Sequence, residues 1–291
     1  MGFIEYTTTE QDAGKPVQSV LLNRMQISKS LLSRLKRRPA GILVNGRRVY
    51  ATCRLNAGDV VRADVGDEAP PRALAPREIA LTVLYEDAFF LALDKPAGVP
   101  VHPTKDPSEA NLEQGLLRYL PEGAYPHFVS RLDKGTTGLM LVAKSGYAHE
   151  LMKRRQHSDA YYREYLAVAE GVPDPPCGTI DAPIGLAAGS RYAHCVRADG
   201  ARSVTEYETL RAGGGRSLLQ VRPQTGRTHQ IRVHLAYIGH PLTGDWLYGE
   251  QSESIQRPAL HSHRLVFEHP LSGKRIELLS PLPADMAALL Q

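Results

Sequence analysis

The sequence predicts an α+β protein: a large domain on a largely antiparallel mixed sheet, preceded by a small α+β unit. Three features of the chain support this prediction. Strand patterns follow one another from about residue 79 to 291 with only scattered helical segments, whereas a doubly wound domain would alternate the two. A basic segment without acidic residues lies near the N-terminus, and a proline-rich stretch separates it from the strand-rich region. A chain of 291 residues is long enough for two domains.

The N-terminal unit is expected to span residues 1–66 and to begin with two short helices. Ser28 is a typical N-cap for the second helix, and Pro39 ends it. The apolar residues at helical spacing are Val17, Val20, Leu21 and Leu22 in the first helix and Leu31, Leu32 and Leu35 in the second. Asn45-Gly46 then predicts a hairpin turn between two short strands, and residues 55–61 predict a last turn and strand.

A long segment of this unit carries charge of one sign. No Asp or Glu occurs from Ala13 to Gly58, although the net charge of the whole chain is only +4. The basic residues of the segment are Lys15, Arg24, Lys29, Arg34, Lys36, Arg37, Arg38, Arg47, Arg48 and Arg54. A merely solvated face usually mixes both signs, so the segment favours phosphate binding over that alternative.

A linker is expected at residues 67–78, because the stretch from Gly66 to Pro76 holds three prolines and few apolar residues. The large domain, residues 79–291, is expected to open with a hairpin at 81–85 and 89–93. Residues 138–143 predict an apolar strand, and Ser145 caps a helix that runs to about His157. Further strands are expected at 161–169, 204–211 and 217–222, a helix at 228–238, and a hairpin at 265–268 and 275–279.

The composition and the missing motifs exclude several classes of protein. Three widely spaced cysteines without a C-x-x-C pair argue against a disulfide framework or a zinc ribbon. No stretch reaches the roughly 20 apolar residues of a membrane span, and the N-terminus lacks the features of a secretory leader, so a cytoplasmic protein is expected. The usual motifs of nucleotide hydrolysis, hydride transfer and serine hydrolysis are missing.

The histidines raise the question of a metal site. His229 and His234 lie five residues apart on an expected helix, with other histidines nearby. A period of 3.6 residues turns such a pair badly for two ligands, and no H-E-x-x-H motif accompanies it. Packing or contact with a nucleic acid is favoured, and no metal is predicted.

Two arginine-rich polar turns are candidates for chemistry. The segment SRLDKGTTG, residues 130–138, places Asp133 between two basic residues in a loop before a buried strand. Residues 221–234 run from a strand through a glycine turn into a helix, where Arg227, His229 and Gln230 offer donors suited to phosphates or base edges. Taken alone, an Asp beside basic residues is more often a surface pair worth about 0–1 kcal/mol.

Together these turns resemble the motifs of the RluA-type RNA pseudouridine synthases. The first is similar to the active-site loop H-R-L-D-x-x-T-S-G, and GRTHQIRVH, residues 226–234, is similar to G-R-x-H-Q-I/L-R-V-H. KPAGVPVHP, residues 95–103, and GHPLTGD, residues 239–245, resemble K-P-x-G-x-x-x-H-P and G-H-P-I-x-G-D. The four motifs occur in the family's order between about residues 80 and 283. Ser130 and Thr137 stand where the family has His and Ser.

The N-terminal unit in turn resembles the S4 RNA-binding domain, which has two short helices followed by a hairpin with a VNG turn. This resemblance implies that the second helix lies along structured RNA. The basic residues that it implicates are Lys29, Arg34, Lys36, Arg37 and Arg38.

The resemblance implies a pseudouridine-synthase fold and the isomerisation of uridine to pseudouridine in structured RNA. A uridine would be flipped into a pocket, its N1–C1′ bond broken, and C5 joined to C1′. All atoms are kept and nothing is oxidised, so no cofactor is expected. Ribosomal RNA is favoured as the partner, with transfer RNA as the alternative, and a monomer without membrane contact is expected.

Individual roles also follow from the resemblance. Asp133 matches the catalytic aspartate, which attacks C1′ or takes the 2′ proton. Arg232 matches the arginine that pairs with Asp133, with a contact to the RNA backbone as the alternative. Tyr165 matches the tyrosine that stacks on the base, with core packing as the alternative. Arg131 matches a residue that fills the gap left by the base, with a phosphate contact as the alternative, and Leu260 is a candidate pocket wall.

Two rival functions stay open on the sequence. A non-catalytic S4-type RNA-binding protein would use the same basic unit, although the residues expected to be catalytic are all present. A glycosidic hydrolase would need a second carboxylate, for which Asp245 and Glu206 are the candidates.

Overall fold

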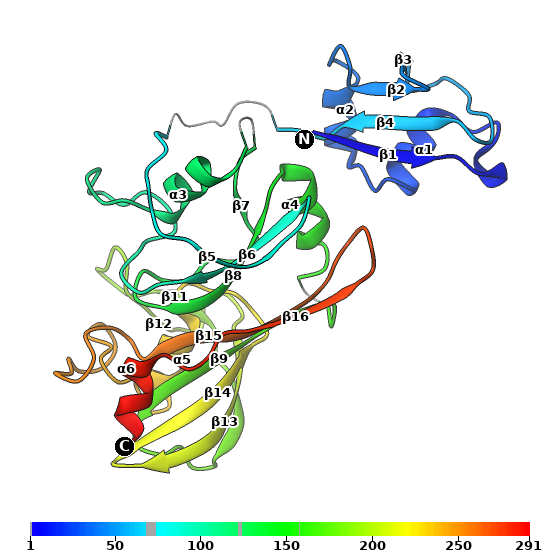
Figure 1. Cartoon of the computed structure of the whole chain (residues 1–291). Coiled ribbons are helices and arrows are strands. Elements are labelled where there is room, and N and C mark those ends of the chain that lie inside the picture. Colours follow the sequence, from blue (N-terminus) through cyan, green and yellow to red (C-terminus); the bar gives the residue numbers. More distant parts are fainter. Residues whose placement is uncertain (1, 68–73, 122–123, 157) are drawn as a thin grey trace.

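The computed structural model describes residues 2–67, 74–121, 124–156 and 158–291, which form a small N-terminal unit and a larger part on a ten-stranded sheet (Figure 1). The expected linker lies partly outside the described residues, which leave out 68–73. On its far side, Gln114 donates from Nε2 to the carbonyl of Ala75, and the Arg77 N–H donates to the carbonyl of Gln114.

An antiparallel sheet of order β1-β4-β2-β3 forms the N-terminal unit together with two helices. The elements are β1 (Phe3–Thr7), η1 (Glu10–Asp12), α1 (Val17–Asn23), α2 (Lys29–Leu35), β2 (Ile42–Val44), β3 (Arg47–Arg48) and β4 (Val60–Asp64). The two helices and the hairpin are as predicted. Strand β1 was not predicted; it is an edge strand whose side chains alternate between exposed and half-buried.

Local sequence explains the main turns of this unit. The Ser28 hydroxyl accepts a hydrogen bond from the Leu31 N–H at 3.2 Å, which caps α2. Asn45 and Gly46 have φ of 49° and 77°, the left-handed pair that a two-residue hairpin turn requires. The Asn-Gly prediction is therefore confirmed.

The large sheet runs β10-β13-β14-β9-β15-β8-β6-β5, with β16 paired to β15 and β7 to β8. Its strands are β5 (Thr82–Glu86), β6 (Phe90–Lys95), β7 (His127–Phe128), β8 (Thr137–Ala143), β9 (Tyr161–Glu170), β10 (Cys177–Asp181), β13 (Val204–Gly213), β14 (Arg216–Pro223), β15 (Leu260–Glu268) and β16 (Arg275–Leu279). A separate pair is formed by β11 (Ile184–Leu186) and β12 (His194–Val196). Among these strands only β15 and β8 pair in parallel, so a mixed and largely antiparallel sheet is confirmed.

The parallel pairing of β15 with β8 joins two halves of the sheet. His261 pairs with Thr137, and Ser262 pairs with Gly138. The backbones approach so closely that a Cβ on Gly138 would lie 2.3 Å from the Ser262 carbonyl oxygen. Figure 1 shows β5, β6 and β8 on one side of this junction and β9, β13 and β14 on the other. The loop that contains Asp133 enters β8 here.

Four helices and one short turn accompany the sheet: α3 (Leu112–Tyr119), α4 (Gly146–Lys153), α5 (Gln230–Tyr237), α6 (Ala284–Ala287) and η2 (Ala288–Leu290). Helix α3 was not predicted, although Asn111 and Gln114 form a capping box at its start. Helix α4 ends short of His157, which lies outside the described residues. Helix α5 begins two residues later than expected, because His229 has a φ of 55°.

Helix α4 connects the two parts of the chain. Tyr147 and Leu151 lie in the same apolar cluster as the helices of the N-terminal unit. The Tyr147 hydroxyl also donates to the Met25 carbonyl at 2.6 Å. Within the described residues, no helix has the length and apolar character needed to cross a membrane.

Candidate active site

A cleft of about 1530 Å³ brings the two predicted polar turns together. Its walls include residues 128–134, 161–163 and 222–232. The basic residues that line it are Arg131, Lys134, Arg163, Arg202, Arg222, Arg227, Arg232 and Arg275, against the acidic residues Asp133, Asp159 and Glu206. This excess of positive charge suits a polyanion.

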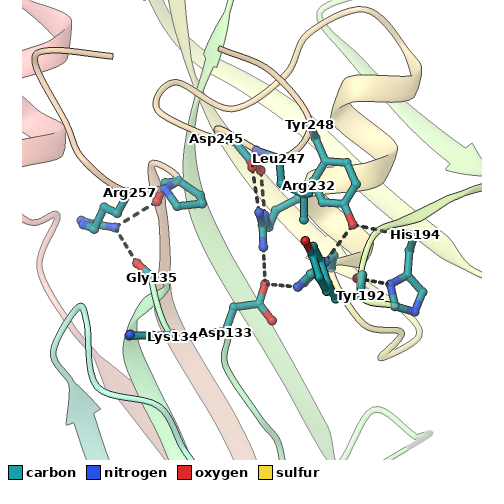
Figure 2. A network of polar contacts seen from close by, with 12 residues as sticks. Asp133, Lys134, Gly135, Tyr192, His194, Arg232, Asp245, Leu247, Tyr248 and Arg257 are labelled. Atoms are coloured by element: carbon teal, nitrogen blue, oxygen red, sulfur yellow. Dashed lines mark hydrogen bonds and ion pairs between the residues drawn. The ribbon is translucent and has the colours of Figure 1, made fainter. Parts of the chain in front are cut away.

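Asp133 and Arg232 face each other in this cleft. Arg232, on α5, donates from Nη1 to Asp133 Oδ2 at 3.2 Å. Its other nitrogens bind Asp245 in a bidentate pair, with Nε to Oδ2 and Nη2 to Oδ1 each at 2.7 Å. Figure 2 shows Arg232 between the two carboxylates. The guanidinium is therefore fixed by one acid and directed at the other.

The two carboxylates differ in their exposure to solvent. The Asp133 side chain is 30% exposed, whereas Asp245 is fully buried and also accepts the Leu247 N–H at 3.2 Å. Burial alone would lower the pKa of Arg232, but the hydrogen bond and charge of Asp245, with those of Asp133, outweigh it and raise that pKa. Arg232 stays charged, and of the two acids only Asp133 can meet a substrate.

Buried polar groups hold the loop that carries Asp133. The Lys95 ammonium donates to the carbonyls of Pro96, Val99 and Lys134 at 2.8, 2.9 and 3.0 Å. Burial lowers the pKa of Lys95 to about 8, while the charge of Asp133 opposes this shift. Because the Lys134 carbonyl directly follows Asp133 in the chain, this anchor limits the movement of the carboxylate.

A second group of contacts ties the same loop to the end of β15. Arg257 donates from Nη1 to the carbonyls of Gly135 and Leu260 at 3.4 and 3.3 Å. Thr137 Oγ1 lies 2.9 Å from His261 Nδ1. The hydroxyl at position 137 thus has a buried partner in the neighbouring strand.

Tyr165 and Leu260 lie in neighbouring strands at the cleft. Tyr165, on β9, pairs with Ser262, and Leu260, on β15, pairs with Ala167. Both side chains line the cleft and are about 95% buried, at 5% and 4% exposure. Their positions suit the wall of a pocket for a flat base.

His229 lies on the other side of Asp133. Its Nε2 is 3.8 Å from Asp133 Oδ2, and its Nδ1 is 2.7 Å from the Tyr248 hydroxyl. The ring of Tyr248 also lies 5.0 Å from the Arg232 guanidinium carbon. His234 points elsewhere: it is buried, with its ring nitrogens 2.9 Å from Thr205 Oγ1 and the Ala182 carbonyl.

Two expected RNA contacts are corrected by the structure. Gln230 is buried, its amide oxygen accepts from Thr225 and Arg227, and its amide nitrogen donates to Val204 and Thr205. Its amide is saturated within the protein, so it shapes the turn and offers nothing to RNA.

Arg38 is also engaged within the protein. It is half-buried and donates from Nη1 to the carbonyls of Asp64 and Gly66, both at 2.8 Å. These bonds hold the end of the N-terminal unit in place. The other expected contacts of this unit are exposed: Lys29, Arg34, Lys36 and Arg37. In the cleft, Arg131 and Arg227 are exposed as well.

Sequence analysis missed three residues of this site. Asp245 was considered only as the second acid of a hydrolase, yet both of its oxygens are bound to Arg232. Lys95 and Tyr248 were not selected. The sequence did contain a signal for Lys95 and Asp245, because they lie in the stretches 95–103 and 239–245, which resemble family motifs. Tyr248 lay just beyond the second stretch and carried none.

Comparisons with known proteins agree with this site. The family model described as RNA pseudouridylate synthase matches residues 90–237. An uncharacterized RNA pseudouridine synthase of Bacillus subtilis, YjbO, is 37% identical over 268 residues, covering 91% of this chain and 95% of the relative. The ribosomal large subunit pseudouridine synthase D of Xanthomonas campestris is 36% identical over 296 residues, covering 96% and 88%.

A solved structure supports the same grouping. Human RNA Pseudouridylate Synthase Domain Containing 1 superposes with a TM-score of 0.56 at 27% identity, covering 69% of this chain and 83% of that one. Family model, relatives and fold agree: the chain belongs to the RNA pseudouridylate synthase family and is an RNA pseudouridine synthase.

Proposed function

We propose that this enzyme isomerises uridine in ribosomal RNA and that Asp133 is its catalytic carboxylate. The observation that carries the proposal is the unequal environment of two acids on one arginine. Asp245 is buried and bound through both oxygens, whereas Asp133 is partly exposed in a basic cleft with Arg232 beside it. A carboxylate that must stay ionised in a closed site needs such a cation.

The reaction keeps every atom of the uridine. The base leaves its helix and enters the cleft, and the N1–C1′ bond breaks. Asp133 either attacks C1′ and forms an ester, or takes the 2′ proton so that a glycal forms. The uracil then turns, C5 bonds to C1′, C5 loses its proton, and N1 gains one. The partly exposed carboxylate of Asp133 suits both routes.

Three further residues have proposed roles in the cleft. The Tyr165 ring stacks on the flipped base, and its hydroxyl helps to move the C5 proton. Leu260, on the adjacent strand, forms another part of the pocket wall. Arg131, exposed at the mouth, fills the place that the base leaves in the RNA. Their burial and exposure support these roles.

The proposed target is large-subunit ribosomal RNA. A relative with 36% identity is named a ribosomal large subunit pseudouridine synthase D, and it matches 96% of this chain. We propose that residues 1–66 form an S4-like domain that holds structured RNA through Lys29, Arg34, Lys36 and Arg37, while residues 79–291 form the catalytic domain. These four residues are exposed and belong to an acid-free segment, which supports the role. Transfer RNA is the alternative target.

A mapping experiment tests target and activity together. Purified enzyme is incubated with separate transcripts of large-subunit ribosomal RNA, small-subunit ribosomal RNA and transfer RNA. Carbodiimide adducts at pseudouridine are then located by the reverse-transcription stops that they cause. New stops confined to the large-subunit transcript are expected. Stops confined to transfer RNA would overturn the proposed target, and the absence of stops in all three would overturn the proposed function.

A further inference from the structure

The two oxygens of the Asp133 carboxylate have different surroundings. Oδ2 lies 3.2 Å from Arg232 Nη1 and 3.8 Å from His229 Nε2. No residue that the structure describes forms a hydrogen bond with Oδ1. The protein thus approaches one oxygen from two sides and leaves the other oxygen to the substrate.

The contacts of Tyr248 determine which nitrogen of His229 carries the proton. The Tyr248 oxygen accepts the backbone N–H of His194, on β12, at 2.9 Å. Its own O–H then points to His229 Nδ1 at 2.7 Å, the acceptor that the described residues offer. If Nδ1 accepts, the neutral ring carries its proton on Nε2, the nitrogen that faces Asp133. A lone pair on Nε2 would instead face a carboxylate and be repelled.

The protonation states of both groups fit this assignment. Burial raises the pKa of Tyr248, so its hydroxyl keeps the proton that it donates. Burial also lowers the pKa of His229, and the opposing charge of Asp133 does not reverse this shift. The ring is therefore neutral near pH 7, with one N–H to direct.

The backbone at His229 is another sign of a functional position. Its φ of 55° lies in the left-handed region, which is unfavourable for a residue with a side chain. Such strain persists where surrounding structure demands it and is often found at functional sites. Here it sets the start of α5 at Gln230 and lets the ring reach both Tyr248 and Asp133.

We infer that His229 is a positioning residue for Asp133, with an Nε2–H donor whose orientation is set by Tyr248 and by the β12 backbone. The contact of 3.8 Å shortens to a hydrogen bond once RNA closes the cleft, as catalytic contacts often do. The Asp133 oxygen that remains free is then aimed at the sugar. This inference rests on the proposed role of Asp133, and it replaces the expected RNA contact of His229 with an internal one.

Two substitutions at His229 distinguish the roles of its two ring nitrogens. His229→Asn tolerates the left-handed backbone and can meet Tyr248, but its amide is too short to reach Asp133. His229→Gln places an N–H near the position of Nε2, and Gln26 already adopts a φ of 53° in this chain. Tyr248→Phe keeps the ring beside Arg232 but removes the donor to Nδ1. Tyr237→Phe is the matched control, since it removes the hydroxyl of an exposed tyrosine that does not line the cleft.

The measurement is single-turnover release of tritium from a large-subunit ribosomal RNA transcript labelled at uridine C5, over a range of enzyme concentrations. We expect His229→Asn to slow the rate at saturation by about 10- to 100-fold, the value of one hydrogen bond to a charged group. The half-saturating enzyme concentration should stay the same. His229→Gln should recover most of the rate, Tyr248→Phe should be slowed, and Tyr237→Phe should match the wild type.

Two results would overturn the inference. One is an unchanged rate for His229→Asn. The other is a loss for both His229 variants that appears as a higher half-saturating concentration, which would restore the RNA-contact role. Asp133→Asn in the same assay keeps the two proposals apart: if that variant is inactive while His229→Asn is fully active, only the inference about His229 fails. If Asp133→Asn is active, the proposed function fails.

Discussion

At the scale of single residues, the charge of Asp133 is controlled by side chains from distant parts of the chain. Arg232 lies 99 positions away in the sequence, and Asp245 follows 13 positions after Arg232. The Arg232 guanidinium is bound by a carboxylate on each side, so it cannot rotate away from Asp133. Asp245 therefore serves Asp133 although the two do not touch.

Substitution of Asp245 tests this dependence. Asp245→Asn keeps the size of the side chain but removes the charge that orients Arg232. We expect the free energy of unfolding to fall by up to about 3–5 kcal/mol, because one partner of a buried ion pair is lost. The single-turnover rate should fall by about 10- to 100-fold. Urea unfolding and tritium release measure the two effects.

Asp199→Asn is the control for that experiment. Asp199 also forms a bidentate pair, with Arg197, but it is 72% exposed. Solvent screens such a pair, so neither stability nor rate should change measurably. Equal effects of the two substitutions would contradict the orienting role of Asp245.

The motifs pointed to residues that lie close together in the fold, but they did not reveal which side chains are bound within the protein. Asp133 and Arg232 came from motifs, and the structure places them in contact. Gln230 was expected to bind RNA as a donor of the glycine turn, and Arg38 was expected to do so because of the resemblance to the S4 domain. Both side chains bind groups that lie far away in the sequence; for Arg38 these are carbonyls 26 and 28 residues away. The neighbouring residues in the sequence do not reveal such partners.

At the scale of elements, the site depends on the junction of β8 with β15. This pairing spans two residue pairs, yet it sets the Asp133 loop beside Leu260 and His261. Gly138 makes it possible, since it combines a φ of 103° with the close approach of the Ser262 backbone. In the strand order of the large sheet, this pairing joins the two halves, and residues from both halves line the cleft.

We expect Gly138→Ala to separate the two strands. The added Cβ overlaps the Ser262 carbonyl, and the backbone conformation is strained for alanine. The free energy of unfolding should fall by about 2–5 kcal/mol, with loss of most activity. Gly213→Ala is the control, because a Cβ at Gly213 meets no atom within 4 Å. Similar unfolding midpoints for the two variants would contradict this view of the junction.

Most elements with strong local signals were predicted, and helix α3, with its capping box, is an exception. The Asn-Gly hairpin and the Ser-capped helices α2 and α4 all have their cause in nearby residues. Strand β1 lacks a sharp hydrophobic alternation, and it exists because β4 offers a free edge. The parallel junction could not be predicted, since no local pattern reports which strands become neighbours.

At the scale of the whole molecule, two basic surfaces belong to one chain. One lines the cleft, and the other is the exposed set Lys29, Arg34, Lys36 and Arg37 of the N-terminal unit. Tyr147 and Leu151 of α4 pack against that unit, so the two parts share an apolar contact. Affinity for RNA and chemistry on the base are expected to be separable.

Neutralising the second surface tests that separation. Arg34→Ala combined with Arg37→Ala should weaken binding to large-subunit ribosomal RNA and lower the slope of log affinity against log salt by about 1 for each lost phosphate contact. The single-turnover rate at saturating enzyme should not change. Arg211→Ala, an exposed arginine on β13, should alter neither. A fall in the saturated rate would show that the unit takes part in catalysis.

The order of the two parts could be read from charge and proline content, and the α+β class from the succession of strands. The strand order could not be predicted, because it depends on pairings between residues more than a hundred positions apart. The cleft is a product of that order, so its residues could be named from motifs but not placed.

The most direct test of the central claim is tritium release by Asp133→Asn under single-turnover conditions, with RNA affinity measured in parallel. The variant keeps the shape of the side chain and loses its charge. We expect no release above background and an affinity for large-subunit ribosomal RNA equal to that of the wild type, because Asp133 performs the chemistry and other residues hold the RNA. Release at a rate near that of the wild type would contradict the role of Asp133.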